Sequence, residues 1–63
     1  MLVTLLAGCS DDPEALLDTA QLEEKQNNPD HARELYERIV RDDPETLAAT
    51  IAHERLKALD AAP

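Results

Sequence analysis

Apolar residues recur along most of the chain at the spacing of amphipathic α-helices. The clearest stripe follows positions i, i+3, i+4, i+7 and i+8 within residues 29–42, and consists of Ala32, Leu35, Tyr36, Ile39 and Val40. Residues 13–26 carry a weaker stripe of Leu16, Leu17 and Ala20. Residues 44–59 carry a third, made of Ala48, Ile51, Ala52, Leu56 and Leu59. No alternating strand pattern competes, so the sequence predicts an all-α fold of three helices.

The connections between the expected helices are short. They cover about residues 27–29 and 42–44, so neighbouring helices are expected to run antiparallel. Asn27-Asn28 can form the first turn because Asn tolerates a left-handed backbone. We therefore expect one helical unit over residues 13–60 and a frayed tail over residues 61–63.

The tetrapeptide Asp-Asp-Pro-Glu occurs twice, at residues 11–14 and 42–45, which are 31 residues apart. Each copy has the residue types of a helix start: an Asp that can cap free N–H groups, a Pro for the first helical position and a Glu at the positive dipole end. Both copies lead into apolar periodicity. The pattern predicts that Asp12 and Asp43 are helix caps and that Pro13 and Pro44 begin helices.

The order helix, turn, helix, Asp-Pro, helix resembles a tetratricopeptide repeat followed by its capping helix. Ala32, Tyr36 and Pro44 reproduce the family's spacing of small residue, aromatic residue and terminal Pro. In the first helix, Thr19 and Glu23 depart from the Leu and Tyr that the family prefers. The resemblance implies that the repeat packs through Leu16, Ala20, Ala32, Tyr36, Ile39 and Pro44. A three-helix hairpin of unrelated origin is the alternative.

The first nine residues carry no charge, and seven of them are apolar. They end in Leu6-Ala7-Gly8-Cys9, which resembles the lipobox of bacterial lipoprotein signal peptides. In such a signal, small residues admit the peptidase and the thiol receives a diacylglycerol. The resemblance implies cleavage before Cys9, so that residues 1–8 form a signal segment and residues 9–12 an acylated Cys with an acidic linker.

This apolar segment is too short to span a bilayer, which takes roughly 20 apolar residues. It also lacks the basic residues and the longer apolar stretch of a complete signal, which favours further signal sequence upstream of Met1. In a two-membrane envelope, Ser10 rather than Asp after the Cys implies the outer membrane. The alternative is an ordinary Cys in an apolar terminus.

The composition excludes several classes of function. The chain has 63 residues, with 14 acidic against 6 basic, for a net charge of −8. The negative balance argues against nucleic acid as a partner, and the length argues against a pocket for a small-molecule substrate. A single Cys excludes a disulfide within the chain.

The residues that could carry chemistry do not form a recognisable site. His31 and His53 are 22 residues apart, with neither the i, i+4 His spacing nor the Cys partners of a zinc site. The acidic pair Glu23-Glu24 is assigned to a solvated helix face, and no Ser or Tyr has an adjacent activating base. We expect no catalytic residue, no metal, no cofactor and no enzymatic activity.

These features favour a small lipid-anchored envelope protein that serves as a protein-interaction or scaffold module through a repeat-like helical surface. Its partners would be the membrane, through the lipid anchor, and either an unknown protein or a second copy of the chain. The first helix generally lines the groove of such a repeat, so the candidate contacts are Gln21, Leu22, Lys25 and Gln26. The alternatives are a structural or stress-type small lipoprotein with no dedicated groove, and an accessory subunit of an envelope complex. An exposed apolar strip would favour the binding module.

Overall fold

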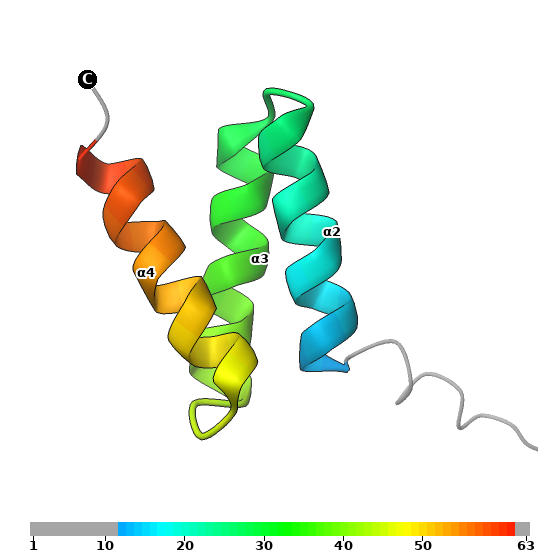
Figure 1. The fold of residues 1–63 in the computed structure, drawn as a ribbon, viewed down its shortest axis with the longest axis vertical. Helices are drawn as coiled ribbons and strands as arrows, with labels where there is room; N and C mark the ends of the chain where they lie inside the picture. Colours follow the sequence, from blue (N-terminus) through cyan, green and yellow to red (C-terminus); the bar gives the residue numbers. More distant parts are fainter. Residues whose placement is uncertain (1–11, 62–63) are drawn as a thin grey trace, which may run out of the picture.

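The computed structural model describes residues 12–61 of the chain, and this part consists of three α-helices without strands. They are α2 (Pro13–Lys25), α3 (Pro29–Asp42) and α4 (Leu47–Ala61). Helix α3 runs antiparallel to α2, and α4 turns back to run in the same direction as α2 (Figure 1). The expected all-α, three-helix fold is confirmed.

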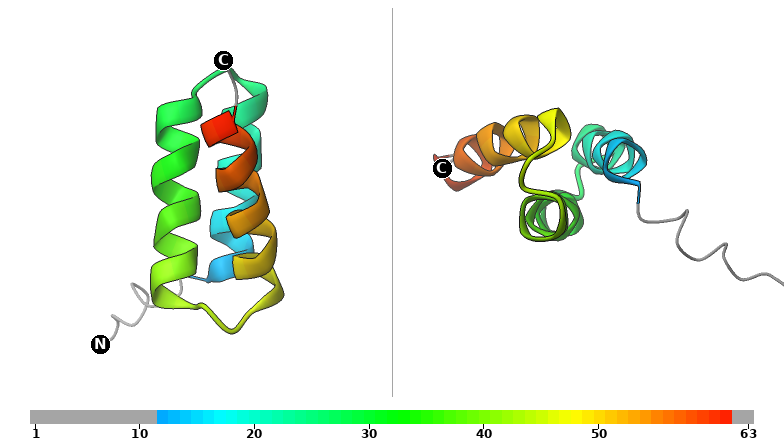
Figure 2. Two further views of the ribbon diagram at one scale, coloured as in Figure 1. Left: turned by 90° about the vertical axis from the view of Figure 1, so that its left-hand side faces the viewer. Right: turned by 90° about the horizontal axis from the view of Figure 1, so that it is seen from below.

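The helices form two layers. Helices α2 and α4 lie in one layer and α3 lies in the other, as the view along the bundle shows (Figure 2). Helix α3 packs extensively against both of its neighbours, whereas α2 and α4 contact each other much less. Helices α2 and α4 therefore lie side by side against α3.

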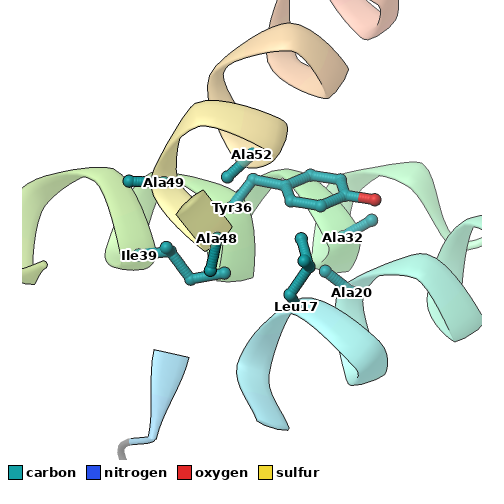
Figure 3. Close-up of a cluster of buried hydrophobic side chains, with 8 residues drawn as sticks. All are labelled: Leu17, Ala20, Ala32, Tyr36, Ile39, Ala48, Ala49 and Ala52. Carbon is teal, nitrogen blue, oxygen red and sulfur yellow. The ribbon is translucent and has the colours of Figure 1, made fainter. Parts of the chain in front are cut away.

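The core is small and rich in alanine. Among the residues that the structure describes, five of the eight buried ones are Ala, so the helices approach closely, and the ring of Tyr36 fills the space between them (Figure 3). The buried residues are Leu17, Ala20, Ala32, Tyr36, Ile39, Ala48, Ala49 and Ala52. Five larger apolar side chains pack partly buried around this centre: Leu16, Leu35, Val40, Leu56 and Leu59.

The turn between α2 and α3 follows the sequence expectation. Asn27 has a φ of 67°, in the left-handed region that Asn tolerates better than most residues. Its neighbour Asn28 donates its backbone N–H to the Glu23 carbonyl at 2.8 Å, which satisfies one free carbonyl at the end of α2. Pro29 then occupies the first position of α3, where a missing N–H costs nothing.

The expected start of the third helix is wrong. Helix α4 begins at Leu47, not at residue 44, because Asp43 ends α3 by donating its N–H to the Ile39 carbonyl at 2.9 Å. Thr46 caps α4 instead: its Oγ1 accepts the Ala49 N–H at 3.1 Å and donates to the Asp43 carbonyl at 2.8 Å. Pro44 lies exposed in the turn.

At the first copy of the tetrapeptide, the prediction holds only in part. Pro13 begins α2 and Asp12 occupies its N-cap position, but the Asp12 side chain makes no capping hydrogen bond. The Asp12 backbone carbonyl accepts the Leu16 N–H at 3.0 Å. Identical tetrapeptides therefore end in different local structures: the second follows directly on α3, and its Asp43 ends that helix.

The buried face of α4 also differs from the predicted stripe. Ala49 is buried, whereas Ile51 is 41% exposed. Three small side chains, Ala48, Ala49 and Ala52, let α4 approach its neighbours closely, and the larger Ile51 side chain lies at the edge of that contact. An apolar residue expected in the core is thus left on the surface.

The capping arrangement predicts that Thr46→Ala destabilises the protein by about 1 kcal/mol, because the Ala49 N–H loses its acceptor. Asp43→Ala is the matched control, since Asp43 was the expected cap and its side chain makes no capping bond to α4. Urea denaturation followed by circular dichroism measures both variants. A larger loss of stability in Asp43→Ala than in Thr46→Ala would contradict the assignment of Thr46 as the cap of α4.

Candidate functional site

A polar network joins all three helices. The Glu24 carboxylate of α2 accepts three hydrogen bonds, one from Tyr36 of α3 and two from Arg55 of α4. Tyr36 Oη donates to Oε1 at 2.6 Å, Arg55 Nε donates to Oε1 at 3.0 Å, and Arg55 Nη2 donates to Oε2 at 2.8 Å. The two bonds from the guanidinium form the bidentate pairing that makes Arg–carboxylate contacts directional.

The Glu24 side chain is only 17% exposed, so the carboxylate is not the solvated surface group that the sequence indicated. Residues 24 and 55 are 31 positions apart, far outside the reach of local helix pairing. The network therefore fixes the separation of α2 and α4, which sets the width of the groove.

The network shifts the ionisation of its members. Hydrogen bonds from Arg55 lower the pKa of Glu24 below its ordinary value, with a smaller lowering by Tyr36, although burial acts in the opposite direction. Burial and the bond to Glu24 raise the pKa of Tyr36 to about 12. At neutral pH the network therefore consists of a carboxylate, a neutral phenol and a guanidinium.

These shifts predict the alkaline behaviour of the protein. A raised pKa means that Tyr36 contributes stability fully below pH 10, its unfolded value, and loses it as the pH rises toward about 12. Tyr36 is the only Tyr of the chain, so tyrosinate absorbance reports this group alone. We expect a titration midpoint well above 10 that falls in Glu24→Ala. A midpoint near 10 in the unmodified chain would contradict the burial of the phenol.

A surface hollow adjoins the network between α2 and α4. It is lined by Gln21, Glu24 and Lys25 of α2 and by Arg55 of α4. Two of the four contact residues expected from the sequence, Gln21 and Lys25, thus line the same hollow.

The other two expected contact residues, Leu22 and Gln26, do not line this hollow. Leu22 is 50% exposed and lies about 140° around α2 from the buried Leu17, at about 100° per residue, so it faces outward from the bundle.

Helical spacing identifies the residues that share a side of each helix with the lining of the hollow. Residues at i, i+4, i+7 or i+8, and i+11 share one side of a helix. The side of α2 that carries the hollow's lining therefore presents Glu14, Asp18, Gln21 and Lys25. The corresponding side of α4 presents Leu47, Ile51, Arg55 and Ala58. We call these two rows, with the hollow between them, the α2/α4 groove.

The exposed apolar residues of α4 beside the groove were not predicted from the sequence. Leu47 is 80% exposed and Ile51 is 41% exposed, one helical turn apart. Ile51 was expected in the core, and Leu47 was not assigned to any face. The signal that could have located them is Thr46, a strong N-cap residue directly before Leu47.

The remaining polar clusters serve the turns and helix ends. Glu23 accepts a hydrogen bond from Asn28 Nδ2 at 2.9 Å and lies 3.2 Å from His31 Nδ1, which ties α2 to the start of α3. Arg33 pairs with Asp60 and so ties α3 to the end of α4. His53 is exposed on α4. Within residues 12–61, no three His, Cys, Asp or Glu side chains are grouped as metal ligands would be.

The spacing between the starts of α2 and α4 matches the repeat length of a known family. Helices α2 and α4 begin at Pro13 and Leu47, which are 34 residues apart, the period of a tetratricopeptide repeat. The family model for the tetratricopeptide repeat matches residues 13–58 of the 63. The chain belongs to the tetratricopeptide repeat family. Comparisons with curated proteins and with solved structures found no significant match.

In terms of the tetratricopeptide repeat, α2 and α3 are the helix pair of one repeat and α4 is the helix that follows it. Of the expected packing residues, Ala20, Ala32, Tyr36 and Ile39 are fully buried, Leu16 is half-buried and Pro44 is exposed. The 31-residue spacing of the two tetrapeptides does not match the 34-residue spacing of the helix starts. Membership of this family indicates a protein-interaction module.

The lipobox residues Leu6-Ala7-Gly8-Cys9 lie outside the described residues. Among α2, α3 and α4, none has both the length and the apolar character needed to cross a bilayer.

Proposed function

We propose that this chain is a lipid-anchored protein-interaction module of the bacterial cell envelope and that the α2/α4 groove is its binding surface. The observation that carries the proposal is the exposed apolar pair Leu47 and Ile51 beside the groove. A lipoprotein that acts only as a spacer has no use for such a strip, whereas a binding module does. Membership of the tetratricopeptide repeat family supports the same role.

The anchor in this proposal is Cys9, acylated after cleavage of residues 1–8. Multiple acyl chains give stable attachment, because each buried CH₂ contributes about 0.8 kcal/mol. Pro13 follows Cys9 by only four residues, which span at most about 14 Å when extended. The N-terminal end of α2 is thereby held near the membrane surface. Ser10 after the Cys supports the outer membrane where the envelope has two membranes.

The module acts by binding and not by catalysis in this proposal. Of the three charged residues that line the hollow, Glu24 and Arg55 are bonded to each other, so neither is available as a general base or acid. The network holds the groove open to a defined width and thereby preorganises the surface for a partner.

Expression with the upstream DNA, followed by fractionation and intact mass measurement, tests the anchor. We expect a membrane-bound product that starts at Cys9 and carries added lipid mass. In Cys9→Ala this product is lost, whereas Ser10→Asp keeps the lipid and changes only the membrane in which the protein is found. A soluble product that keeps Met1 and an unmodified thiol would contradict the proposal.

A further inference from the structure

The two walls of the groove differ in chemistry near its lower end. Leu47 and Ile51 of α4 present apolar surface, whereas Glu14 and Asp18 of α2 present exposed carboxylates. Because α2 and α4 run in the same direction, the N-terminal half of each helix lies beside that of the other (Figures 1 and 2). Apolar residues of α4 and acidic residues of α2 therefore lie on neighbouring helices in this half of the pair.

The carboxylates on the acidic wall are not neutralised from within the bundle. Within residues 12–61, neither Glu14 nor Asp18 takes part in an ion pair, whereas two arginines of the neighbouring helices are bonded to other carboxylates. Arg55 is bonded to Glu24 and Arg33 to Asp60. The basic residue on the same row of α2, Lys25, lies two to three turns away at the opposite end.

This arrangement selects among possible occupants. A purely apolar segment would remove water from Glu14 and Asp18 without replacing their hydrogen bonds, which is unfavourable. A second copy of the chain carries the same net charge of −8, and an anionic lipid surface is also negative, so both are repelled. A segment with apolar side chains on one edge and Lys or Arg on the other matches both walls.

We infer that the α2/α4 groove binds a basic amphipathic helix of a partner protein, with its apolar residues on Leu47 and Ile51 and its basic residues facing Glu14 and Asp18. Each pair in the groove is spaced by one helical turn, i to i+4, which is the spacing that a helical ligand presents. The inference rests on the proposed function, because it specifies the chemistry of the partner.

Peptide binding to the full chain tests this inference directly. The probe is a fluorescent synthetic helix of about four turns, with Leu on one face and Lys on the other. The control peptide has every Lys replaced by Glu. The protein carries Cys9→Ala so that no lipid is attached, and fluorescence anisotropy measures binding. We expect the Leu/Lys peptide to bind, the Leu/Glu peptide not to bind, and high salt to weaken the complex.

Substitutions in each wall locate the binding. We expect E14Q/D18N to weaken binding about fivefold and L47A/I51A about tenfold. The matched controls are E34Q/E37Q, which removes two exposed charges from α3, and Leu22→Ala, which removes an exposed apolar side chain from the outer face of α2. Both controls are expected to change affinity less than about twofold. Circular dichroism establishes that each variant keeps its helices.

Four results would overturn the inference: no binding of the Leu/Lys peptide, equal binding of both peptides, equal effects of groove and control substitutions, or a dimer that L47A/I51A dissociates. The dimer would assign the groove to a second copy of the chain. Any of these results, together with membrane attachment that depends on Cys9, would leave the anchor standing. Peptide binding without membrane attachment would contradict the lipid anchor and would still support the groove as the binding surface.

Discussion

Replacing Tyr36 by Ala is expected to remove most of the folding stability of the protein at 25 °C. The ring is fully buried between the three helices, and truncating a buried aromatic residue costs about 3–5 kcal/mol (Figure 3). A unit of about 50 residues has a total stability of roughly 3–8 kcal/mol, so this loss removes most of it. Far-ultraviolet circular dichroism with urea denaturation measures the result.

Tyr36→Phe separates the ring from its hydroxyl. Phe keeps the packing and removes only the hydrogen bond to Glu24, which remains bonded to Arg55. We expect a loss of about 1 kcal/mol and a folded protein at 25 °C. Equal stabilities of Tyr36→Ala and Tyr36→Phe would show that the ring does not fill the centre of the bundle.

Ala20→Leu is expected to cause the second large loss of folding stability. Ala20 is fully buried in α2, and the added atoms have no space there. Overpacking of this kind costs about 1–3 kcal/mol and forces neighbouring helices apart. Urea denaturation measures the loss, and a broken Tyr36–Glu24 hydrogen bond would show as a lower tyrosinate midpoint.

Ala15→Leu is the matched control for this substitution. Ala15 is exposed on the same helix, and Leu is nearly as good a helix former as Ala, so the expected change is within about 0.5 kcal/mol. If the two variants lost the same stability, Ala20 would not be a point of close helix approach.

The first two helices could be predicted almost to the residue. Residues 13–26 and 29–42 were expected, and the structure has Pro13–Lys25 and Pro29–Asp42. Their signals are local: a Pro at the first position of each helix, a clear apolar stripe in the second, and Asn27 in the left-handed region between them. Local signals of this kind act without knowledge of the tertiary structure.

The third helix was predicted less well because two groups compete for the same segment. Asp43 can cap a new helix or end the preceding one, and the hydrogen bond to Ile39 decides for the end of α3. Thr46 then provides the cap. The resulting shift places Ala49 inside and Ile51 at the edge, which no apolar pattern of this short segment could distinguish.

The network and the groove depend on contacts between distant residues. Glu24 meets Tyr36 and Arg55 across 12 and 31 positions, so local pairing rules could not find it. The wall of the groove on α2 could be predicted in part, since Gln21 and Lys25 lie in the hollow. The wall on α4 required the position of α4 relative to α2.

Crosslinking from the groove in intact cells tests most directly whether this surface binds the partner of the anchored chain. A photo-activated side chain replaces Ile51 in the wall of the groove, and in a control chain it replaces the exposed Glu34 of α3. We predict one discrete adduct from position 51 that is absent from position 34 and is lost when Cys9→Ala is added. No adduct from position 51, or the same adducts from both positions, would contradict the role of the groove.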